Sequence, residues 1–146
     1  MTKSIQRELL IPQPREQVWR ALTDSTALAE WMFPNDFAPR VGHHFTFQVP
    51  PNPKVGFNGM VVSCEVLECE PPHRLVFSWS AGGVGDTRVS FRLEPDGDGT
   101  RVFFEHSGFD LSQPWGKQAF RGAELGWQKM FERLTSVVAG LAADLN

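Results

Sequence analysis

The chain has 146 residues and a net charge of −3, with 14 basic and 17 acidic residues closely mixed along it. This length predicts one domain, residues 1–146, and the mixed charge, without a basic patch or stripe, argues against nucleic-acid binding. No apolar run approaches the roughly 18 residues of a membrane span, and the N-terminus has no apolar signal region, so we expect a cytoplasmic protein.

The first part of the chain predicts a strand followed by two short helices. Apolar residues alternate over 4–11, which is typical of a strand. Pro14 suits the first turn of a helix, where its missing N–H costs nothing, and we expect that helix over 15–23. Asp24 or Ser25 can then cap a second short helix.

The middle of the chain alternates between apolar and polar residues, which predicts strands separated by turns. We expect strands over 44–49, 57–70, 74–80, 86–93 and 101–106. The pair Asn58-Gly59 also fits a tight hairpin turn, so the continuity of 57–70 stays open. Gly82-Gly83 is a turn sequence. Consecutive strands joined by short turns form an antiparallel sheet.

The last thirty residues predict one long amphipathic helix. Apolar residues recur from Phe120 to Leu141 at the i, i+3, i+4, i+7 spacing. Between Gly116 and Ala143 such a helix would be about 42 Å long. Because an antiparallel sheet can bury one face only, and this helix can cover that face, the sequence predicts a two-layer α+β fold with a sheet of about six strands.

Six local sequences, taken in order, resemble one known family. They are Val18-Trp19-Arg20-Ala21-Leu22-Thr23-Asp24, Glu30-Trp31-Met32, Pro72-His73-Arg74-Leu75-Val76-Phe77-Ser78-Trp79, Gly99-Thr100-Arg101-Val102, His106-Ser107-Gly108-Phe109 and Gly126-Trp127. The chain resembles the family related to the activator of the heat-shock-protein-90 ATPase, in the START/SRPBCC (birch-pollen-allergen-like) superfamily. The resemblance covers nearly the whole chain. It implies a helix-grip fold, in which a curved antiparallel sheet wraps around the long C-terminal helix, often leaving a ligand cavity between them.

The candidate ligand site is a set of mainly aromatic side chains, in a chain with 12 Phe, 5 Trp and no Tyr. These side chains either fill the core or line a cavity for an apolar or aromatic ligand. Gly122 and Gly126 favour a cavity, because small residues on a covering helix either admit close backbone approach or leave empty space. The residues that we expect at the ligand are Trp31, Met32, Phe33, Phe37, Phe45, Phe47, Met60, Trp79, His106, Phe109, Trp115, Ala123, Glu124, Trp127 and Met130.

Two members of this set are ionisable. His106 follows Val102 and Phe104 on the inward side of its strand, so it is either a hydrogen-bonded core histidine or a pocket group that titrates near neutral pH. Glu124 lies at the edge of the last helix's apolar face. It is either a solvated flank or, if it points inward, a partner for His106 or an arginine.

The sequence predicts no metal site, no cofactor and no catalytic residues. His43 and His44 are neighbours on a strand and point in opposite directions, so they cannot easily share an ion. There is no Gly-x-Ser-x-Gly nucleophile elbow. Cys64 and Cys69 are five positions apart on one predicted strand, which should place them on opposite faces and without a mutual disulfide.

Three functions fit the sequence. The first is a protein that binds a hydrophobic small molecule between sheet and helix. The second, implied by the resemblance, is an interaction module that activates a chaperone ATPase in the stress response. The third is a cyclase or hydrolase acting on a hydrophobic substrate, for which His106 with Glu124 or Arg92 is the only acid–base arrangement that the sequence suggests. A monomer and a homodimer both stay open.

Overall fold

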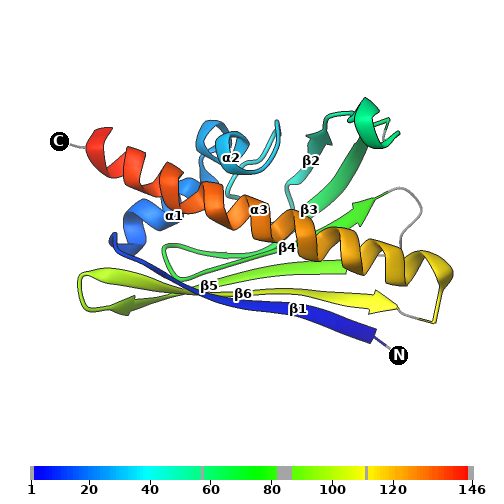
Figure 1. The fold of residues 1–146 in the computed structure, drawn as a ribbon. Helices are drawn as coiled ribbons and strands as arrows, with labels where there is room; N and C mark the ends of the chain where they lie inside the picture. Colours follow the sequence, from blue (N-terminus) through cyan, green and yellow to red (C-terminus); the bar gives the residue numbers. More distant parts are fainter. Residues whose placement is uncertain (1, 57, 82–86, 111, 145–146) are drawn as a thin grey trace.

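The protein is described by a computed structural model that covers residues 2–56, 58–81, 87–110 and 112–144. Along the chain the elements are β1 (Thr2–Ile11), α1 (Arg15–Thr23), α2 (Ser25–Trp31), β2 (His44–Val49), the short 3-10 helix η1 (Pro53–Val55), β3 (Met60–Glu70), β4 (Arg74–Ala81), β5 (Thr87–Asp96), β6 (Gly99–Asp110) and α3 (Pro114–Asp144). This order matches the predicted one (Figure 1).

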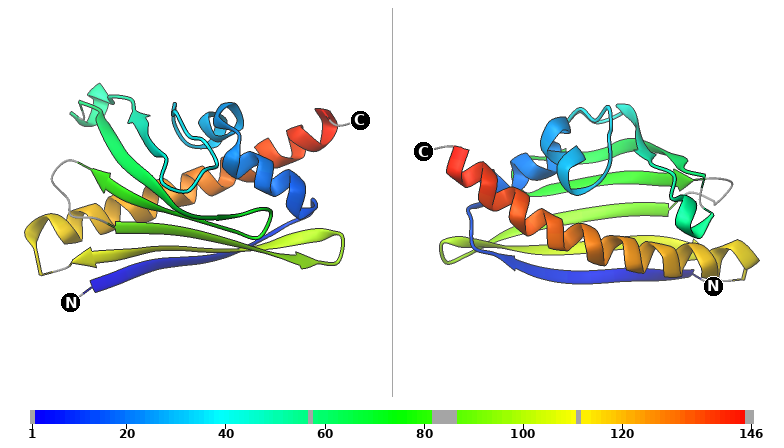
Figure 2. Two further views of the ribbon diagram at one scale, coloured as in Figure 1. Left: turned by 180° about the vertical axis from the view of Figure 1, so that it is seen from behind. Right: turned by 45° about the horizontal axis from the view of Figure 1, so that its top comes forward.

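The six strands form one antiparallel sheet in the order β1-β6-β5-β4-β3-β2. The α1–α2 segment carries the chain from β1 at one edge of the sheet to β2 at the other. All three α-helices lie on the same face, and α3 runs across it (Figure 2). The sheet curves toward α3 on the side of β2 and β3 (Figure 1). The predicted α+β helix-grip fold is therefore confirmed.

The residue before each short helix, Pro14 for α1 and Asp24 for α2, caps its N-terminus. Pro14 immediately precedes α1, and its carbonyl accepts hydrogen bonds from the backbone N–H groups of Gln17 and Val18. Of the two predicted caps for α2, the structure uses Asp24. Its carboxylate accepts from the N–H groups of Thr26 (2.9 Å) and Ala27 (3.2 Å), which have no partner within the helix.

The connection between β2 and β3 is longer than a tight hairpin. Val49 pairs with Met60, so Asn58-Gly59 ends a connection over 50–59 rather than forming a two-residue turn. Gly59 has a φ of +86°, and a Cβ there would lie 2.9 Å from the Val49 carbonyl oxygen, so both the conformation and the space require glycine. Phe57 and the predicted turn at Gly82-Gly83 lie outside the described residues.

A register shift in β3 changes which side chains face the core. The pairing with β4 shifts between Val66 and Glu68, and Cys69 then pairs with the buried Leu75. Both free cysteines, Cys64 and Cys69, consequently pack on the core side. The expectation that they face opposite sides is wrong, because one extra residue in a strand reverses the alternation that follows it.

The inward face of α3 forms one layer of the core. The predicted apolar stripe is confirmed: its members Phe120, Trp127, Met130, Phe131, Leu134, Val138 and Leu141 are buried, while Ala123 and Val137 are partly buried. Within the described residues, none of the helices combines the length and the hydrophobicity that crossing a membrane would need.

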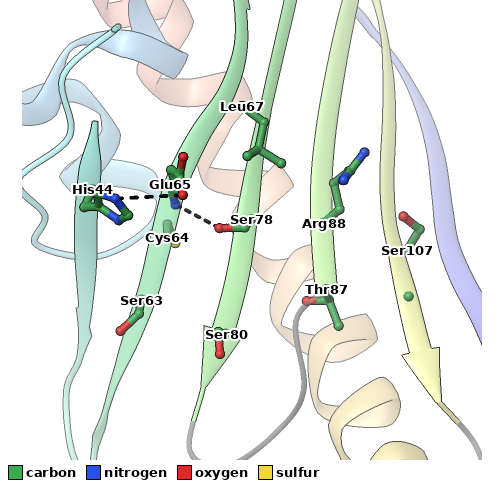
Figure 3. A pocket seen from close by; sticks show the side chains of 11 residues that line it. His44, Ser63, Cys64, Glu65, Leu67, Ser78, Ser80, Thr87, Arg88 and Ser107 are labelled. Carbon is green, nitrogen blue, oxygen red and sulfur yellow. Dashed lines mark hydrogen bonds and ion pairs between the residues drawn. The ribbon is translucent and has the colours of Figure 1, made fainter. Parts of the chain in front are cut away.

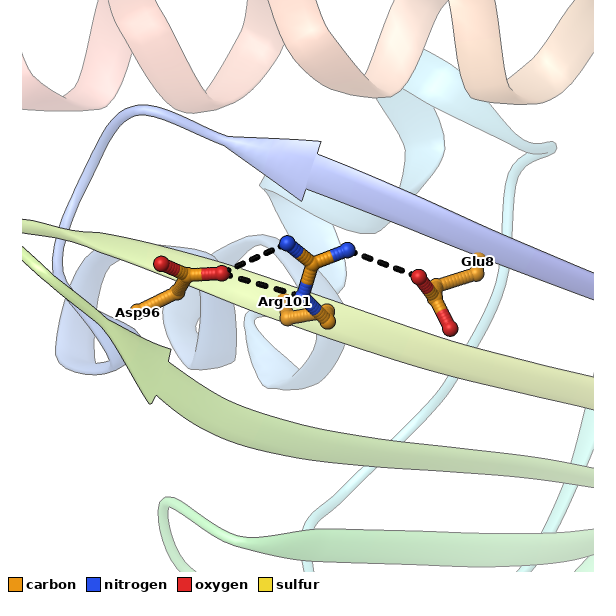
Figure 4. A network of polar contacts seen from close by, with 3 residues as sticks. All are labelled: Glu8, Asp96 and Arg101. Carbon is orange, nitrogen blue, oxygen red and sulfur yellow. Dashed lines mark hydrogen bonds and ion pairs between the residues drawn. The ribbon is translucent and has the colours of Figure 1, made fainter.

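Polar contacts and a close backbone approach join β1 to β6 at one end of the sheet. Arg101 on β6 binds Asp96 at the end of β5 and Glu8 on β1, each at 2.7 Å (Figure 4). The two carboxylates raise the pKa of the Arg101 guanidinium, Asp96 more than Glu8. Gly99 lies so close to β1 that a Cβ would come within 2.6 Å of the Ile11 carbonyl oxygen.

Candidate ligand-binding site

Aromatic rings form a continuous cluster between the sheet and α3. Trp127 of α3 lies 4.5 Å from Phe104 and 5.5 Å from Phe131, measured between ring centroids. At the other side of the core, Phe45 lies 5.5 Å from both Phe47 and Phe77. Stacked, tilted and edge-to-face rings at such separations are in direct contact, so much of the predicted aromatic set fills space.

The predicted site residues divide by exposure. Those that are buried are Trp31, Met32, Phe37, Phe45, Phe47, His106, Phe109, Trp127 and Met130. Those that are partly buried are Phe33, Trp79, Ala123 and Glu124. Met60, the first residue of β3, is 40% exposed. The side chain of Trp115 lies outside the described part of the structure.

His106 is held by a chain of hydrogen bonds that joins α3 to the sheet. The indole N–H of Trp127 donates to Nδ1 of His106 (3.0 Å). Nε2 of His106 lies 2.7 Å from Oγ1 of Thr87, and that hydroxyl donates to the Trp79 carbonyl at 2.7 Å. Because an indole nitrogen can only donate and a carbonyl can only accept, Nδ1 carries no proton and Nε2–H donates to Thr87.

This environment keeps the imidazole neutral. His106 is 1% exposed, and burial lowers its pKa from 6.5 to about 3. The charged form is disfavoured because it would lose its hydration, and because a protonated Nδ1 could no longer accept from Trp127. Of the two interpretations of this residue, the structure therefore supports the hydrogen-bonded core histidine rather than a group that titrates near neutral pH.

The acid–base arrangement suggested by the sequence is not assembled. Glu124 lies 3.8 Å from Arg7 of β1, and both side chains are about two-fifths exposed, at 41% and 43%. Arg92 lies on the outer face of the sheet, 2.8 Å from Glu94 and 4.1 Å from the Phe103 ring centroid. Neither residue contacts His106. Within the described residues, no three His, Cys, Asp or Glu side chains gather where they could hold a metal.

Among the described residues, part of the apolar inner surface beside α3 is only partly buried. Because Glu124 faces β1, Ala123 and Gly126 lie on the opposite flank of the helix, away from β1. Trp79 of β4 is partly exposed there, 5.7 Å from Trp127 and 5.6 Å from Phe47 between centroids. Val49, the last residue of β2, is partly exposed as well. We call Val49, Trp79, Ala123 and Gly126 the apolar margin.

Gly126 leaves open space at the apolar margin. Among the described residues, a Cβ built there would meet only Cε of Met130, at 4.0 Å. Of the two roles that a small residue on a covering helix can have, the described residues therefore indicate empty space at Gly126 rather than close backbone approach. Gly122 also has no described atom within 4 Å of a built Cβ, but it is exposed to solvent.

Sequence reasoning missed the role of Thr87. The alternation of β5 places Thr87 on the inner face with Val89 and Phe91, and a hydroxyl among apolar inward positions signals a buried polar partner. The identity of that partner could not be read from the sequence, because His106 lies 19 positions away.

The chain was compared with known families and structures. The family model described as "Activator of Hsp90 ATPase homolog 1-like protein" matches residues 12–139. A search of the curated proteins found no match. Among solved structures, protein MLL2253 from Mesorhizobium loti is 34% identical, with a TM-score of 0.81, and the match covers 94% of this chain and 97% of that one.

Two further structures are similar over most of the chain. Protein BH1534 from Bacillus halodurans is 30% identical with a TM-score of 0.75, and 94% of this chain and 99% of that one are covered. CalU16 from Micromonospora echinospora is 28% identical with a TM-score of 0.74, over 95% of this chain and 76% of that one. The family match extends from the end of β1 into the last turns of α3, and the chain belongs to the family of activator of Hsp90 ATPase homolog 1-like proteins.

Proposed function

We propose that this protein binds an apolar, aromatic small molecule at the apolar margin, between the inner face of the sheet and the first half of α3. The observation that carries the proposal is the position of Trp79. Its ring packs against Trp127 and Phe47, but the side chain is only partly buried. An aromatic ligand placed there would stack on an indole and cover apolar surface that α3 leaves open.

The packing of the deeper core indicates how far such a ligand would enter. The rings of Trp127, Phe104 and Phe131 are in mutual contact, and both ring nitrogens of His106 are hydrogen-bonded. A ligand that displaced them would leave buried polar groups unpaired, at a cost of about 1–3 kcal/mol for each group. The ligand therefore rests against this cluster, and His106 supports the wall without touching the ligand.

Family membership supports the same function, because members of this family bind hydrophobic ligands. The described exposed large apolar side chains give no comparable support to a chaperone-docking module. They are Leu10, Val41, Met60, Val61 and Leu125, which lie on β1, the loop before β2, the start of β3 and the solvent side of α3.

A neutral aromatic dye tests the proposal. N-phenylnaphthylamine should bind with increased fluorescence, and Gly126→Leu should abolish most of that increase by filling the open space that Gly126 leaves on α3. The substitution should not unfold the protein, because leucine favours a helix over glycine by about 1 kcal/mol. Leu125→Ala is the matched control, since Leu125 is the neighbouring residue and is 64% exposed. Equal dye binding by wild type and Gly126→Leu would contradict the proposal.

A further inference from the structure

The outer face of the sheet, opposite α3, carries a groove of about 680 Å³. Its lining comes from five neighbouring strands, β2 to β6 (Figure 3). Unlike those of the apolar margin, most of its lining residues carry polar side chains, four of them serines: Ser63, Ser78, Ser80 and Ser107. Ser63 of β3 and Ser80 of β4 are directly paired. Because both side chains are small, the groove is deeper at this position.

The ladder between β3 and β4 opens in this floor. Paired positions run to Ser63↔Ser80 and resume at Val66↔Phe77. Between them, the backbone N–H of Glu65 donates to Oγ of Ser78 at 2.9 Å (Figure 3). Because this hydroxyl accepts from the backbone, its own hydrogen is left to donate into the groove. The Ser78 hydroxyl thus takes the place of a backbone acceptor between β3 and β4, and it can donate a hydrogen bond to a ligand in the groove.

Arg88 contributes a guanidinium from the neighbouring strand. Arg88 of β5 is paired with Ser78 on one side and with Ser107 on the other, and in Figure 3 the Ser78 hydroxyl points toward Glu65, away from Arg88. Arg88 forms no ion pair with the residues that the structure describes, whereas Arg92, four positions further along the same face, binds Glu94. A guanidinium with a hydroxyl donor on the neighbouring strand is suited to an oxyanion.

The other side of the groove offers different groups. His44 and Glu65 lie 3.8 Å apart on β2 and β3, with Ser63 next to them (Figure 3). Two strand spacings, about 10 Å, separate β3 from β5. A ligand that reached from Arg88 to Glu65 would therefore meet donors for an oxyanion at one end, and at the other end a carboxylate and hydroxyls that suit sugar-like hydroxyl groups.

We propose that this groove binds a small polyhydroxylated molecule that carries one oxyanion, a phosphate or a carboxylate. The oxyanion accepts hydrogen bonds from Arg88 and Ser107, and the hydroxyl groups extend past Ser78 toward Glu65. This site goes beyond the proposed hydrophobic site and does not depend on it, because the two lie on opposite faces of the sheet.

Amide NMR spectra of the full chain, recorded during titrations, test the proposal. Glucose phosphate or gluconate should cause saturable shifts of the amide signals at Ser78, Arg88 and Ser107. The probe that binds with the higher affinity shows whether the site prefers a phosphate or a carboxylate. Glucose should cause no such shifts. Arg88→Gln should weaken binding about tenfold or more, which is the effect of losing a charge-assisted hydrogen bond. Arg92→Gln is the matched control and should leave the affinity unchanged.

Three results would overturn this site. The first is the absence of saturable shifts up to about 10 mM of either probe. The second is an equal loss of affinity in Arg88→Gln and Arg92→Gln. The third is binding of inorganic phosphate as tight as that of glucose phosphate, which would remove the role of the hydroxyl end. Binding of the neutral dye should be the same in Arg88→Gln and in the wild type. A negative result for the groove would therefore not contradict the proposed hydrophobic site at the apolar margin.

Discussion

The indole N–H of Trp127 donates a hydrogen bond to Nδ1 of His106 across 3.0 Å, and both side chains are about 1% exposed. This bond joins α3 to β6 in the middle of an apolar core. Through Thr87 and the Trp79 carbonyl it continues to β5 and β4. The helix is therefore positioned on the sheet by a directional contact as well as by apolar packing.

Replacing His106 by leucine should lower the free energy of unfolding by about 2–4 kcal/mol, because it leaves the Trp127 N–H buried without an acceptor. A glutamine side chain at this position would keep an acceptor and a donor, so His106→Gln should cost less. Urea denaturation measures both. Trp127→Phe removes the other partner of the bond, and the double variant with His106→Leu should cost less than the sum of the single variants. Strict additivity would mean that the bond contributes nothing of its own.

The stability of the protein should fall below neutral pH because of His106. In the unfolded chain this histidine titrates at 6.5, whereas in the fold burial lowers its pKa to about 3. The unfolded state therefore binds the extra proton between these values. The contribution of neutral His106 to the free energy of unfolding is fully present above pH 6.5. It decreases as the pH falls toward 3, by about 2 kcal/mol between pH 7 and pH 5. In denaturation curves His106→Gln should lack this component, and an unchanged pH slope in that variant would contradict the assignment.

Gly99→Ala should destabilise the protein strongly, while Gly140→Ala should not. A Cβ at residue 99 would lie 2.6 Å from the Ile11 carbonyl oxygen, so the backbone of β1 or β6 would have to move. At residue 140 of α3 a Cβ would meet no atom of the described residues within 4 Å, and alanine favours the helix by about 1 kcal/mol. Thermal denaturation should give a lower Tm for the first variant and an equal or higher Tm for the second. A similar Tm for both would contradict the close approach of β1 to β6.

Alkylation should distinguish the two cysteines of β3. Burial raises the pKa of both thiols, and that of Cys64 the more strongly, since Cys64 is 4% exposed and Cys69 is only partly buried. Because the thiolate is the nucleophile, iodoacetamide at pH 8 should modify Cys69 before Cys64. Mass spectrometry of peptides measures the order, and both should react fully in urea. Faster labelling of Cys64 in the native protein would contradict the burial of its side chain.

The spacing of apolar residues predicted the helices and strands correctly, but it did not predict the inward-facing side of every residue. It predicted α3 and its buried stripe from Phe120 to Leu141, because a helix repeats every 3.6 residues whatever lies beneath it. It placed Cys69 on the wrong face, since the register shift after Val66 depends on the pairing with β4. A bulge belongs to two strands, and one strand's sequence does not contain it.

The candidate site was predictable only in outline. The inward direction of His106 follows from the alternation of its strand, but its two hydrogen-bond partners come from β5 and α3. The groove of the outer face left a weaker signal, the outward serines of β3, β4 and β6, which is also the ordinary pattern of a solvated sheet face.

The sequence by itself determined the order of the elements, their inward faces and the family, because periodicity, caps and local motifs are properties of neighbouring residues. Only the tertiary structure decided that His106 is neutral and that Glu124 binds Arg7. It likewise decided that Trp79 is only partly buried. Burial, the pKa of a side chain and the space around it depend on residues that are distant in the chain and come together only when the sheet closes around α3.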